Sequence, residues 1–376
     1  MAAIMAAIME ITENIMRRMR EPSTKLHNAL YFMSGMMVVI LALVIVAGVK
    51  TKAENAGFHI TDDTENSYEQ QVAGQTDTTQ DSGQEKWQEG VVAYQGKEYL
   101  YNTDIKTYLM MGVDINGPVQ QSSDYTQGGQ SDALFLLVVN NKTEQLQVIS
   151  INRNTMADIE LCDEEGIDMG PLKTQICLQH AFGDGKRLSC SKTVDAVSGL
   201  FQNIPISGYL AMNMGGIPQM NDAVGGVEVT VLQDISFPKA GVDLKKGQKV
   251  TLNGTQAYYY LHGRDTEEYD SATKRLQREE QYIVAYMDKL KKVSTENPDQ
   301  VTEIYNSVSD YLVTSVDFTS MIEQLMNYGF SEDQMYTVPG KTVEGKPIDG
   351  KRYEEYHVDE DAMEELIMKV FYTPVQ

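Results

Sequence analysis

The sequence has few cysteines: Cys162, Cys177 and Cys190 are the only three in 376 residues. An odd number allows at most one internal disulfide. Neither a CxxC pair nor a pair of closely spaced histidines accompanies them, which argues against a zinc site. Cys177 and Cys190 bracket a glycine-rich loop. We expect a disulfide between them in an oxidising compartment, and three reduced cysteines in a reducing one.

Basic residues are also scarce, with 31 Lys and Arg against 54 Asp and Glu and a formal net charge of −23. This composition excludes a broad nucleic-acid-binding surface, so we expect no nucleic-acid partner. The segment YYYLHGRDTEEYDSATKRLQREEQY (258–282) is an exception. Its Arg275 and Arg278 are three residues apart, on one face of an expected helix. Either they pair with the neighbouring acidic residues on a solvated helix, or an anion lies between them.

One long uncharged run lies near the start of the chain. Residues Ala29–Val49 could cross a bilayer core of roughly 30 Å as a helix. Arg17, Arg18 and Arg20 precede the run, which favours a cytoplasmic N-terminus. The run is longer than the apolar region of a cleaved signal peptide, roughly 7–15 residues. We therefore predict a retained single-pass anchor with the larger part of the chain outside the cell.

Composition changes along the chain divide it into five segments. Residues 50–89 are polar and acidic with little apolar spacing, which is typical of a flexible linker. We expect a main domain from residue 90 and an α/β extension after residue 295 that packs on it. The predicted segments are 1–28 (cytoplasmic), 29–49 (transmembrane), 50–89 (linker), 90–295 (main extracellular domain) and 296–376 (extension).

The main domain alternates strand-like and helix-like patterns without a regular βαβ period. The sequence predicts a hairpin turning at Gln95-Gly96 and buried strands at 107–114, 133–140, 146–152 and 227–232. It predicts helices at 174–182, 191–201, 255–263 and 272–292, and a methionine-bearing helix within 208–220. We therefore expect an α/β fold in which helices layer a mixed central β-sheet.

Several motifs occur in a defined order between Asp104 and Lys292. They are TYLMMGVD, GGQSDALFLLVVN, VISINRNT, NDAVGGVEVTV, LKKGQKVTLNGTQAYYYLHGR and the helix that carries Arg275 and Arg278. In this order they resemble the LytR-CpsA-Psr family of Gram-positive bacteria. The resemblance implies a phosphotransferase in the plasma membrane. Such an enzyme takes an anionic glycopolymer (teichoic-acid-like or capsular) from a polyprenyl-pyrophosphate carrier and attaches it to peptidoglycan through a phosphodiester.

The resemblance also implies roles for individual residues. Asp114 and Asp132 match the carboxylates of the family's metal site, so Mg²⁺ or Mn²⁺ is the expected cofactor. Arg153, Arg264 and Arg275 match its arginines, and with the two aspartates they are the candidate catalytic residues. Arg278 occupies the second arginine position of the last motif. Planar guanidiniums suit a pyrophosphate, whose charge must be held while the bridging bond breaks.

Four positions depart from the family pattern. Gln130 and His262 stand where arginines are usual, Glu279 replaces a glutamine, and Asn154 replaces an aspartate. We expect Gln130, His262, Glu279, Arg278 and the three arginines to bind substrate. Gln130 can donate hydrogen bonds, and His262 can carry charge near its ordinary pKa of about 6.5. For Glu279 the sequence leaves three possibilities: it points away, pairs with Arg275, or binds the metal.

A lipid carrier also needs an apolar slot, for which residues 197–206 and 208–220 are the candidates because unbranched methionine adapts to a flexible chain. The departures leave a second function open, a degenerate domain that binds the lipid-linked polymer without transferring it. A third, regulation of transcription, is disfavoured because the acidic chain has no basic DNA-reading helix.

Overall fold

The computed structural model describes residues 91–264, 269–297, 299–316, 321, 326–345 and 353–375. The predicted anchor at 29–49 and the linker at 50–89 lie outside these ranges. Within them, no helix is both long enough and apolar enough to span a bilayer.

A six-stranded mixed sheet forms the centre of the domain, with strand order β13-β8-β3-β4-β5-β14. Its strands pair antiparallel except for β3 with β8 and β5 with β14, which are parallel. The predicted fold class is thereby confirmed. The strands are β3 (Ile105–Val113), β4 (Ser131–Asn140), β5 (Gln145–Ile151), β8 (Gly208–Asn213), β13 (Leu312–Thr314) and β14 (Met335–Thr337).

Both faces of this sheet are covered, which explains the nearly continuous apolar run of β4. Successive side chains of a strand point to opposite faces. Thus Leu134 and Leu136 enter one core, whereas Phe135 and Leu137 enter the other. Strands buried on both faces lose the apolar–polar alternation of half-exposed ones.

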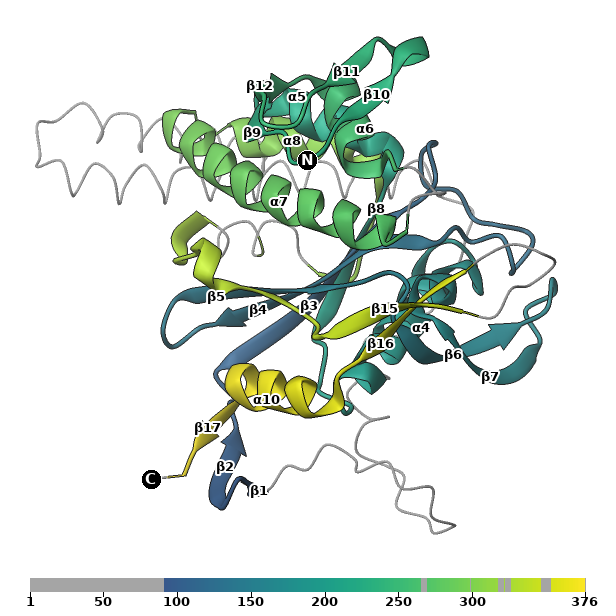
Figure 1. Ribbon diagram of the computed structural model, residues 1–376, viewed down its shortest axis with the longest axis vertical. Helices are drawn as coiled ribbons and strands as arrows, with labels where there is room; N and C mark the ends of the chain where they lie inside the picture. Colours follow the sequence, from purple (N-terminus) through teal and green to yellow (C-terminus); the bar gives the residue numbers. More distant parts are fainter. Residues whose placement is uncertain are drawn as a thin grey trace, which may run out of the picture. The chain divides into compact units, whose positions relative to one another are not determined.

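One face of the sheet packs against α4 (Arg187–Leu200), α10 (Glu360–Phe371) and the short 3₁₀ helix η1 (Ile176–Ala181). A hairpin of β6 (Met156–Cys162) and β7 (Asp168–Gln175) adjoins α4. The opposite face is crossed by the long helix α7 (Ser271–Glu296), and Figure 1 shows α7 and α10 on opposite sides of the sheet.

Further elements surround α7 on that second face. They are α5 (Ile217–Ala223), α6 (Gly254–His262) and α8 (Gln300–Val308), with the strand pairs β9 (Val227–Thr230)–β12 (Lys249–Leu252) and β10 (Ile235–Phe237)–β11 (Val242–Leu244). Helix α6 begins with a capping box, in which Asn253 and Gln256 each accept a hydrogen bond from the other's backbone N–H. This satisfies donors that the first helical turn leaves free.

Two small sheets complete the domain. β1 (Val92–Tyr94) and β2 (Lys97–Tyr101) form the predicted hairpin, and β17 (Tyr372–Pro374) adds a third strand. β15 (Gly340–Glu344) pairs with β16 (Glu354–Val358). Short 3₁₀ turns occupy Met214–Gly216, Pro238–Ala240, Ser309–Tyr311 and Glu332–Gln334.

Two predicted helices differ from the structure. Residues 208–213 form strand β8, and the helix α5 starts only at Ile217. Residues 168–175 form β7, so the predicted helix at 174–182 is reduced to the single 3₁₀ segment η1. The segment 296–376, predicted to pack on the domain, also supplies β13 and β14 at the two edges of the central sheet.

Candidate functional site

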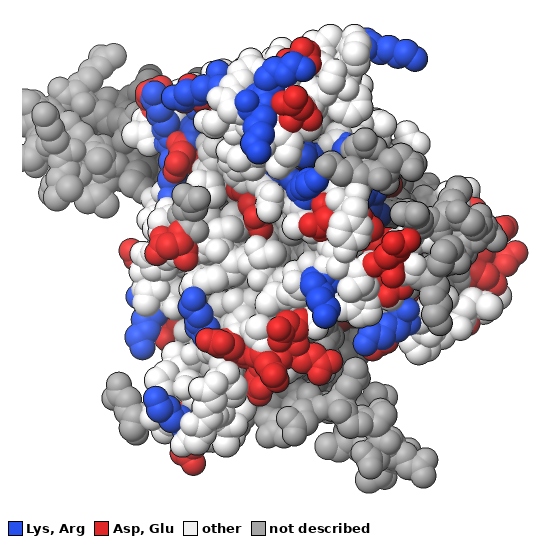
Figure 2. Space-filling model, viewed as in Figure 1, with Lys and Arg blue, Asp and Glu red and all other residues white. Residues whose placement is uncertain are grey.

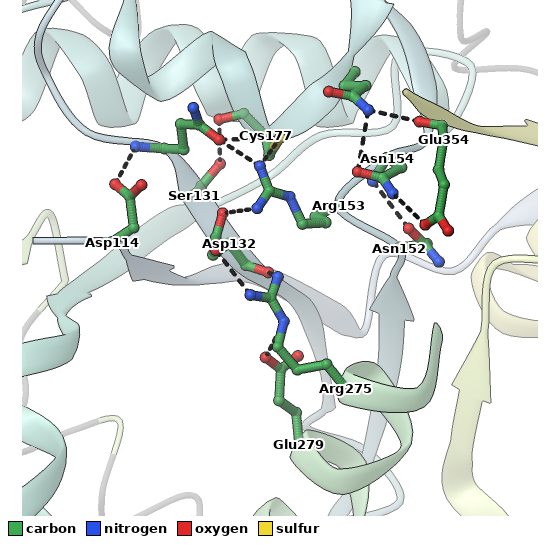
Figure 3. Close-up of polar contacts among 12 residues, drawn as sticks. Asp114, Ser131, Asp132, Asn152, Arg153, Asn154, Cys177, Arg275, Glu279 and Glu354 are labelled. Atoms are coloured by element: carbon green, nitrogen blue, oxygen red, sulfur yellow. Dashed lines mark hydrogen bonds and ion pairs between the residues drawn. The ribbon is translucent and has the colours of Figure 1, made fainter. Parts of the chain in front are cut away.

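The carboxylate of Asp132, near the start of β4, lies between two guanidiniums (Figure 3). Arg153 Nη1 is 2.6 Å from Asp132 Oδ1, and Arg275 Nη1 is 2.8 Å from Asp132 Oδ2. Arg275 Nη2 also donates to the main-chain oxygen of Asp132 at 2.9 Å. Burial raises the pKa of Asp132, but Arg275 and Arg153 outweigh it and hold the pKa below its ordinary value. Residues from β4, the end of β5 and α7 therefore meet in one ionised cluster.

Both arginines make further contacts, although the buried Nε of Arg153 has no hydrogen-bond partner. Arg153 Nη2 donates to Gln130 Oε1 and to Cys177 Sγ, the latter at 3.0 Å. Gln130 thus accepts a hydrogen bond through its carbonyl oxygen, where we expected it to act as a donor. Arg275 Nε lies 3.4 Å from Glu279 Oε1, one helical turn further along α7.

Glu279 therefore takes the second of the three possibilities left by the sequence, pairing with Arg275. Its side chain is buried, and burial raises its pKa to about 7 although Arg275 opposes the shift. Near neutral pH this position holds a carboxyl group that exchanges a proton, whereas the glutamine usual in the family is neutral at any pH.

Asp114, directly after β3, lies at the open side of the cluster. Its Oδ1 accepts from the backbone N–H of Gln130 at 2.6 Å. Partial desolvation by the surrounding chain raises the pKa of Asp114, the Gln130 N–H lowers it, and the charge of Asp132 raises it further. The backbone N–H groups of Asp114 (3.0 Å) and Asp132 (3.1 Å) both donate to the carbonyl oxygen of Gln130, so the two aspartates are neighbours. In the described ranges, no group of three or more His, Cys, Asp and Glu side chains is arranged to hold a metal.

His262 and Arg264 approach the cluster from the end of α6. Burial, and then the charge of Arg275, lower the pKa of His262. Our expectation that His262 carries charge near pH 6.5 is therefore wrong for this environment. The pKa of Arg264 is also lowered by burial and by Arg275 and Arg153. Three arginines thus gather around Asp132, and their mutual repulsion favours an anionic ligand.

Arg278 is directed elsewhere. Its guanidinium donates to the carbonyl oxygens of Tyr260 (2.7 Å) and Gly263, and to Gln233 Oε1 at 2.7 Å. The predicted contact of Arg278 with substrate stays a prediction. These bonds instead fix the end of α6, the element that carries His262 and leads to Arg264.

A cavity of about 290 Å³ lies between the central sheet and α7, and the ionic cluster forms its polar end. Asp132, His262, Arg275 and Glu279 line that end, and the other lining residues are apolar or glycine. They include Met110, Phe135, Leu137, Val148, Leu210, Met212, Met214, Ile217, Met220, Tyr282, Tyr286, Met287, Leu290 and Ile304. The predicted slot residues within 208–220 do line the cavity. Those within 197–206 do not: Val197, Phe201 and Ile204 belong to the core on the other face of the sheet.

All three cysteines are buried and free, so the predicted Cys177–Cys190 disulfide is wrong. The thiol of Cys177 contacts Arg153, whereas the thiol of Cys190 lies 3.7 Å from His180 Nε2. The contact between Cys177 and Arg153 was missed by sequence reasoning. Pairing of Met156 with Gln175 at the base of the β6–β7 hairpin brings residue 177 back beside residue 153. Recognising that hairpin and its register is the signal that could have revealed it.

Acidic and basic side chains are interspersed over the face of the molecule in Figure 2, which has no broad basic surface. Three arginines, Arg153, Arg264 and Arg275, instead act together on Asp132. A mixed sheet with an apolar cavity that ends on Asp132, Arg275, Glu279 and His262 defines a class of α/β proteins suited to a ligand with an apolar tail and an anionic head.

The chain belongs to the LytR_cpsA_psr family, whose family model matches residues 61–370. It is 30% identical over 231 residues to the polyisoprenyl-teichoic acid–peptidoglycan teichoic acid transferase TagU of Enterococcus faecalis, covering 61% of this chain and 67% of that one. The TagU of Halalkalibacterium halodurans is 28% identical over 220 residues, 58% of this chain and 64% of its own length. The chain thus matches about two thirds of each relative. Both relatives are named transferases, which supports the prediction of an enzyme.

Solved structures show the same fold. Bacillus subtilis TagV matches with a TM-score of 0.55 at 21% identity, covering 72% of this chain and 96% of that one. Protein gbs0355 of Streptococcus agalactiae matches with a TM-score of 0.54 at 21% identity, covering 71% and 87%. A structure of TagT bound to LI-WTA matches with a TM-score of 0.51 at 19% identity, covering 71% and 90%.

Proposed function

We propose that this protein transfers an anionic glycopolymer from a polyprenyl-pyrophosphate carrier to peptidoglycan and joins the two through a phosphodiester. The observation that carries the proposal is the apolar cavity that ends on Asp132, Arg275, Glu279 and His262. A polyprenyl pyrophosphate has the same division, an apolar chain next to a multiply charged head. The names of the TagU relatives, which specify teichoic acid and peptidoglycan, agree with these substrates.

The apolar part of the cavity suits the carrier lipid. Hydrocarbon removed from water contributes about 0.8 kcal/mol per CH₂ group, so even a few isoprene units add substantially to binding. Methionines from β3, β8, α5 and α7 line the cavity, and their unbranched thioethers can adapt to the shape of a flexible chain.

At the polar end, a hydroxyl of peptidoglycan attacks the phosphorus that bears the glycopolymer. The bond from this phosphorus to the bridging oxygen breaks, and polyprenyl phosphate leaves with the electron pair. The hydroxyl proton passes to solvent or a basic group. Arg153, Arg264 and Arg275 stabilise the negative charge that builds on the phosphate oxygens. Since Asp132 pairs with two of these arginines, the pyrophosphate must share or replace that carboxylate as their partner.

Asp114 and Asp132 would hold the expected Mg²⁺ or Mn²⁺. Magnesium typically takes one or two carboxylates and completes its shell with water and substrate phosphates, so a pair of neighbouring carboxylates at an open edge fits it. When bound, the ion neutralises charge on the pyrophosphate oxygens. Asp114 is the more available of the two, because both oxygens of Asp132 face guanidiniums.

The cellular location belongs to the same proposal. The uncharged run at 29–49 would anchor the chain in the plasma membrane of a Gram-positive bacterium, with the catalytic domain outside. Protease added to intact protoplasts should then digest the domain and spare a short N-terminal piece. Full protection of residues 90–376 would contradict this location.

The transfer itself is tested with a polyprenyl-pyrophosphoryl oligosaccharide, peptidoglycan fragments and Mg²⁺ or Mn²⁺. We expect product from the wild-type chain and a loss of at least about a hundredfold in Asp132→Ala, because two arginines lose their partner and a proposed metal ligand is removed. Asp195→Ala is the control, since Asp195 is an exposed carboxyl on α4 that does not line the cavity. Equal activity in the two variants would contradict the proposed role of Asp132.

A binding-only function is the second candidate. It is favoured by one observation: in this structure Asp132 and Glu279 already neutralise Arg275, and Asp132 also pairs with Arg153. Lipid retention that depends on Arg153 and Arg275, without product for any acceptor or metal ion, would support binding over transfer.

A further inference from the structure

The short helix η1 lies against both chain segments that carry the ionic cluster. On one side, the N–H of Gly128 donates to the carbonyl of Ala181 at 3.0 Å. On the other, the N–H groups of Ile176 and Cys177 donate to the carbonyls of Thr155 (2.8 Å) and Arg153 (3.2 Å). This six-residue helix thus connects the segment before β4 with the segment after β5.

The Cys177 side chain holds the Arg153 guanidinium directly. Arg153 Nη2 donates to Cys177 Sγ at 3.0 Å, and the thiol is 4.0 Å from Gln130 Oε1, which accepts from the same Nη2. The thiol is fully buried, so burial raises its pKa and it stays protonated. A protonated thiol can accept from Arg153 while donating weakly to Gln130.

His180 holds the turn that leads into β4. Its Nδ1 is 3.0 Å from the carbonyl oxygens of both Gly128 and Gly129, so Nδ1 carries the proton. Nε2 is then the acceptor for the Cys190 thiol at 3.7 Å. Gly129 has φ +81°, and a Cβ there would lie 2.7 Å from Ile115 Cδ1. The turn that precedes Gln130, Ser131 and Asp132 therefore has little freedom to rearrange.

The outer side of η1 is fixed to the β6–β7 hairpin. Gln179 Oε1 accepts from the backbone N–H of Glu160 at 2.7 Å, and Gln179 Nε2 donates to the backbone oxygen of Glu160 at 3.0 Å. This pair of bonds anchors η1, so its contacts with the site rest on a fixed support.

We infer that Cys177 and His180 are positioning residues for the transfer reaction. Cys177 holds Arg153 extended toward Asp132, and His180 fixes the Gly128–Gly129 turn that places Asp132. The inference rests on the proposed roles of Arg153 and Asp132. Its consequence is preorganisation: the arginine that meets the pyrophosphate is already ordered, so binding does not have to restrict a flexible side chain.

The first test measures binding of geranylgeranyl pyrophosphate to the full-length, detergent-solubilised chain. The bond that is lost joins a charged donor to sulfur, a weak acceptor, and we expect Cys177→Ala to weaken binding about fivefold. Cys177→Ser keeps a donor and an acceptor at this position and should recover part of the loss. Cys162→Ala is the matched control, a buried thiol whose contact is the carbonyl of Tyr125. Equal affinities of Cys177→Ala and Cys162→Ala would overturn the inference.

A double mutant separates positioning from general structural damage. In an Arg153→Ala background, Cys177→Ala should cause no further loss of affinity, because its effect passes through Arg153. A full additional fivefold loss would show that Cys177 acts independently of Arg153, contrary to the inference.

A measurement without ligand keeps this inference distinct from the proposed function. If the wild-type chain does not bind the probe, the proposed function fails. The positioning role is then judged by hydrogen–deuterium exchange of peptides that cover residues 128–133. Exchange there should be faster in Cys177→Ala and in His180→Gln than in Cys162→Ala. Unchanged exchange in both variants would overturn the inference.

Discussion

At the scale of single residues, the ionic cluster holds two arginines, Arg153 and Arg275, in contact with the buried carboxyl groups of Asp132 and Glu279. Buried charges are tolerated when they are paired and hydrogen-bonded. Asp132 is ion-paired at both oxygens, with a guanidinium at each. Glu279 meets this condition only in part, through one contact of 3.4 Å, and its pKa of about 7 reflects that difference.

Glu279 should make stability depend on pH. Its pKa is about 7 in the folded protein, above the value of 4.5 ordinary for glutamate. Between these values the unfolded chain has lost the proton while the folded protein keeps it, so the free energy of unfolding falls as pH rises from about 4.5 to 7. Glu279→Gln removes this decline. Between pH 5 and pH 8, the free energy of unfolding of the variant should therefore rise by about 2–3 kcal/mol relative to that of the wild type.

Thermal unfolding of the two proteins at several pH values checks this prediction. The difference between their midpoints should grow toward high pH and level off above pH 7. A constant difference would mean that Glu279 does not titrate in the folded protein in this range.

The site residues differ in how far the sequence could predict them. Asp132, Arg153 and Arg275 came from ordered motifs, and the structure brings them together. The pairing of Glu279 with Arg275 followed from their i,i+4 spacing as one of three options. The contact of Cys177 with Arg153 could not be predicted from local spacing, because it depends on the β6–β7 hairpin that returns the chain. For the same reason the short separation of Cys177 and Cys190 suggested a disulfide that does not form.

At the scale of elements, α6 and α7 are joined through Arg278. Its guanidinium binds the carbonyl oxygens of Tyr260 and Gly263, near the end of α6, where a helix leaves backbone acceptors without partners. Arg275 and Arg278, three residues apart on α7, therefore have different partners. Arg275 lines the cavity, whereas Arg278 connects two helices.

Arg278→Ala should lower the free energy of unfolding by about 2–3 kcal/mol, because buried carbonyl oxygens lose a charged donor. Arg187→Ala on α4, where the arginine is exposed, should change it by less than about 0.5 kcal/mol. Denaturant unfolding measures both. If Arg278→Ala instead weakens binding of a polyprenyl pyrophosphate without changing stability, Arg278 contacts the substrate, as the sequence suggested.

Strands β3, β4 and β5 were predictable because long runs of apolar and β-branched residues leave few alternatives. Strand β8 was not. GYLAMNMGGIPQM combines residues of low strand propensity with methionine, which fits a helix equally well, and the strand is set by its parallel pairing with β3. Distant pairing of this kind leaves no local signal.

At the scale of the whole molecule, the central sheet is completed by the last part of the chain. β13 and β14 flank β8 and β5, and α10 covers one face with Leu366, Ile367 and Phe371. The family similarity, which extends to residue 370, agrees with this arrangement. The predicted boundary at residue 295 therefore marks the end of the sequence motifs. Residues 90–295 do not form a complete hydrophobic core without the rest of the chain.

A chain that ends at residue 295 should fail to fold. It would lack both edge strands and α10, so apolar residues of both cores would face water. We expect aggregation or rapid proteolysis on expression. A chain that ends at Phe371 is the control, because it removes β17 and keeps the central sheet. A soluble, cooperatively unfolding product ending at residue 295 would contradict this prediction.

The late position of β13 and β14 also matters while the protein is being made. A chain synthesised from its N-terminus can pair β3, β4, β5 and β8 long before residues 312–314 and 335–337 emerge. Until then, β8 and β5 present unpaired edges, which readily add strands from other chains. Synthesis adds about 5–20 residues per second, so the interval before completion lasts seconds. A nascent chain therefore needs protection from self-association during that interval, before both edge strands are in place.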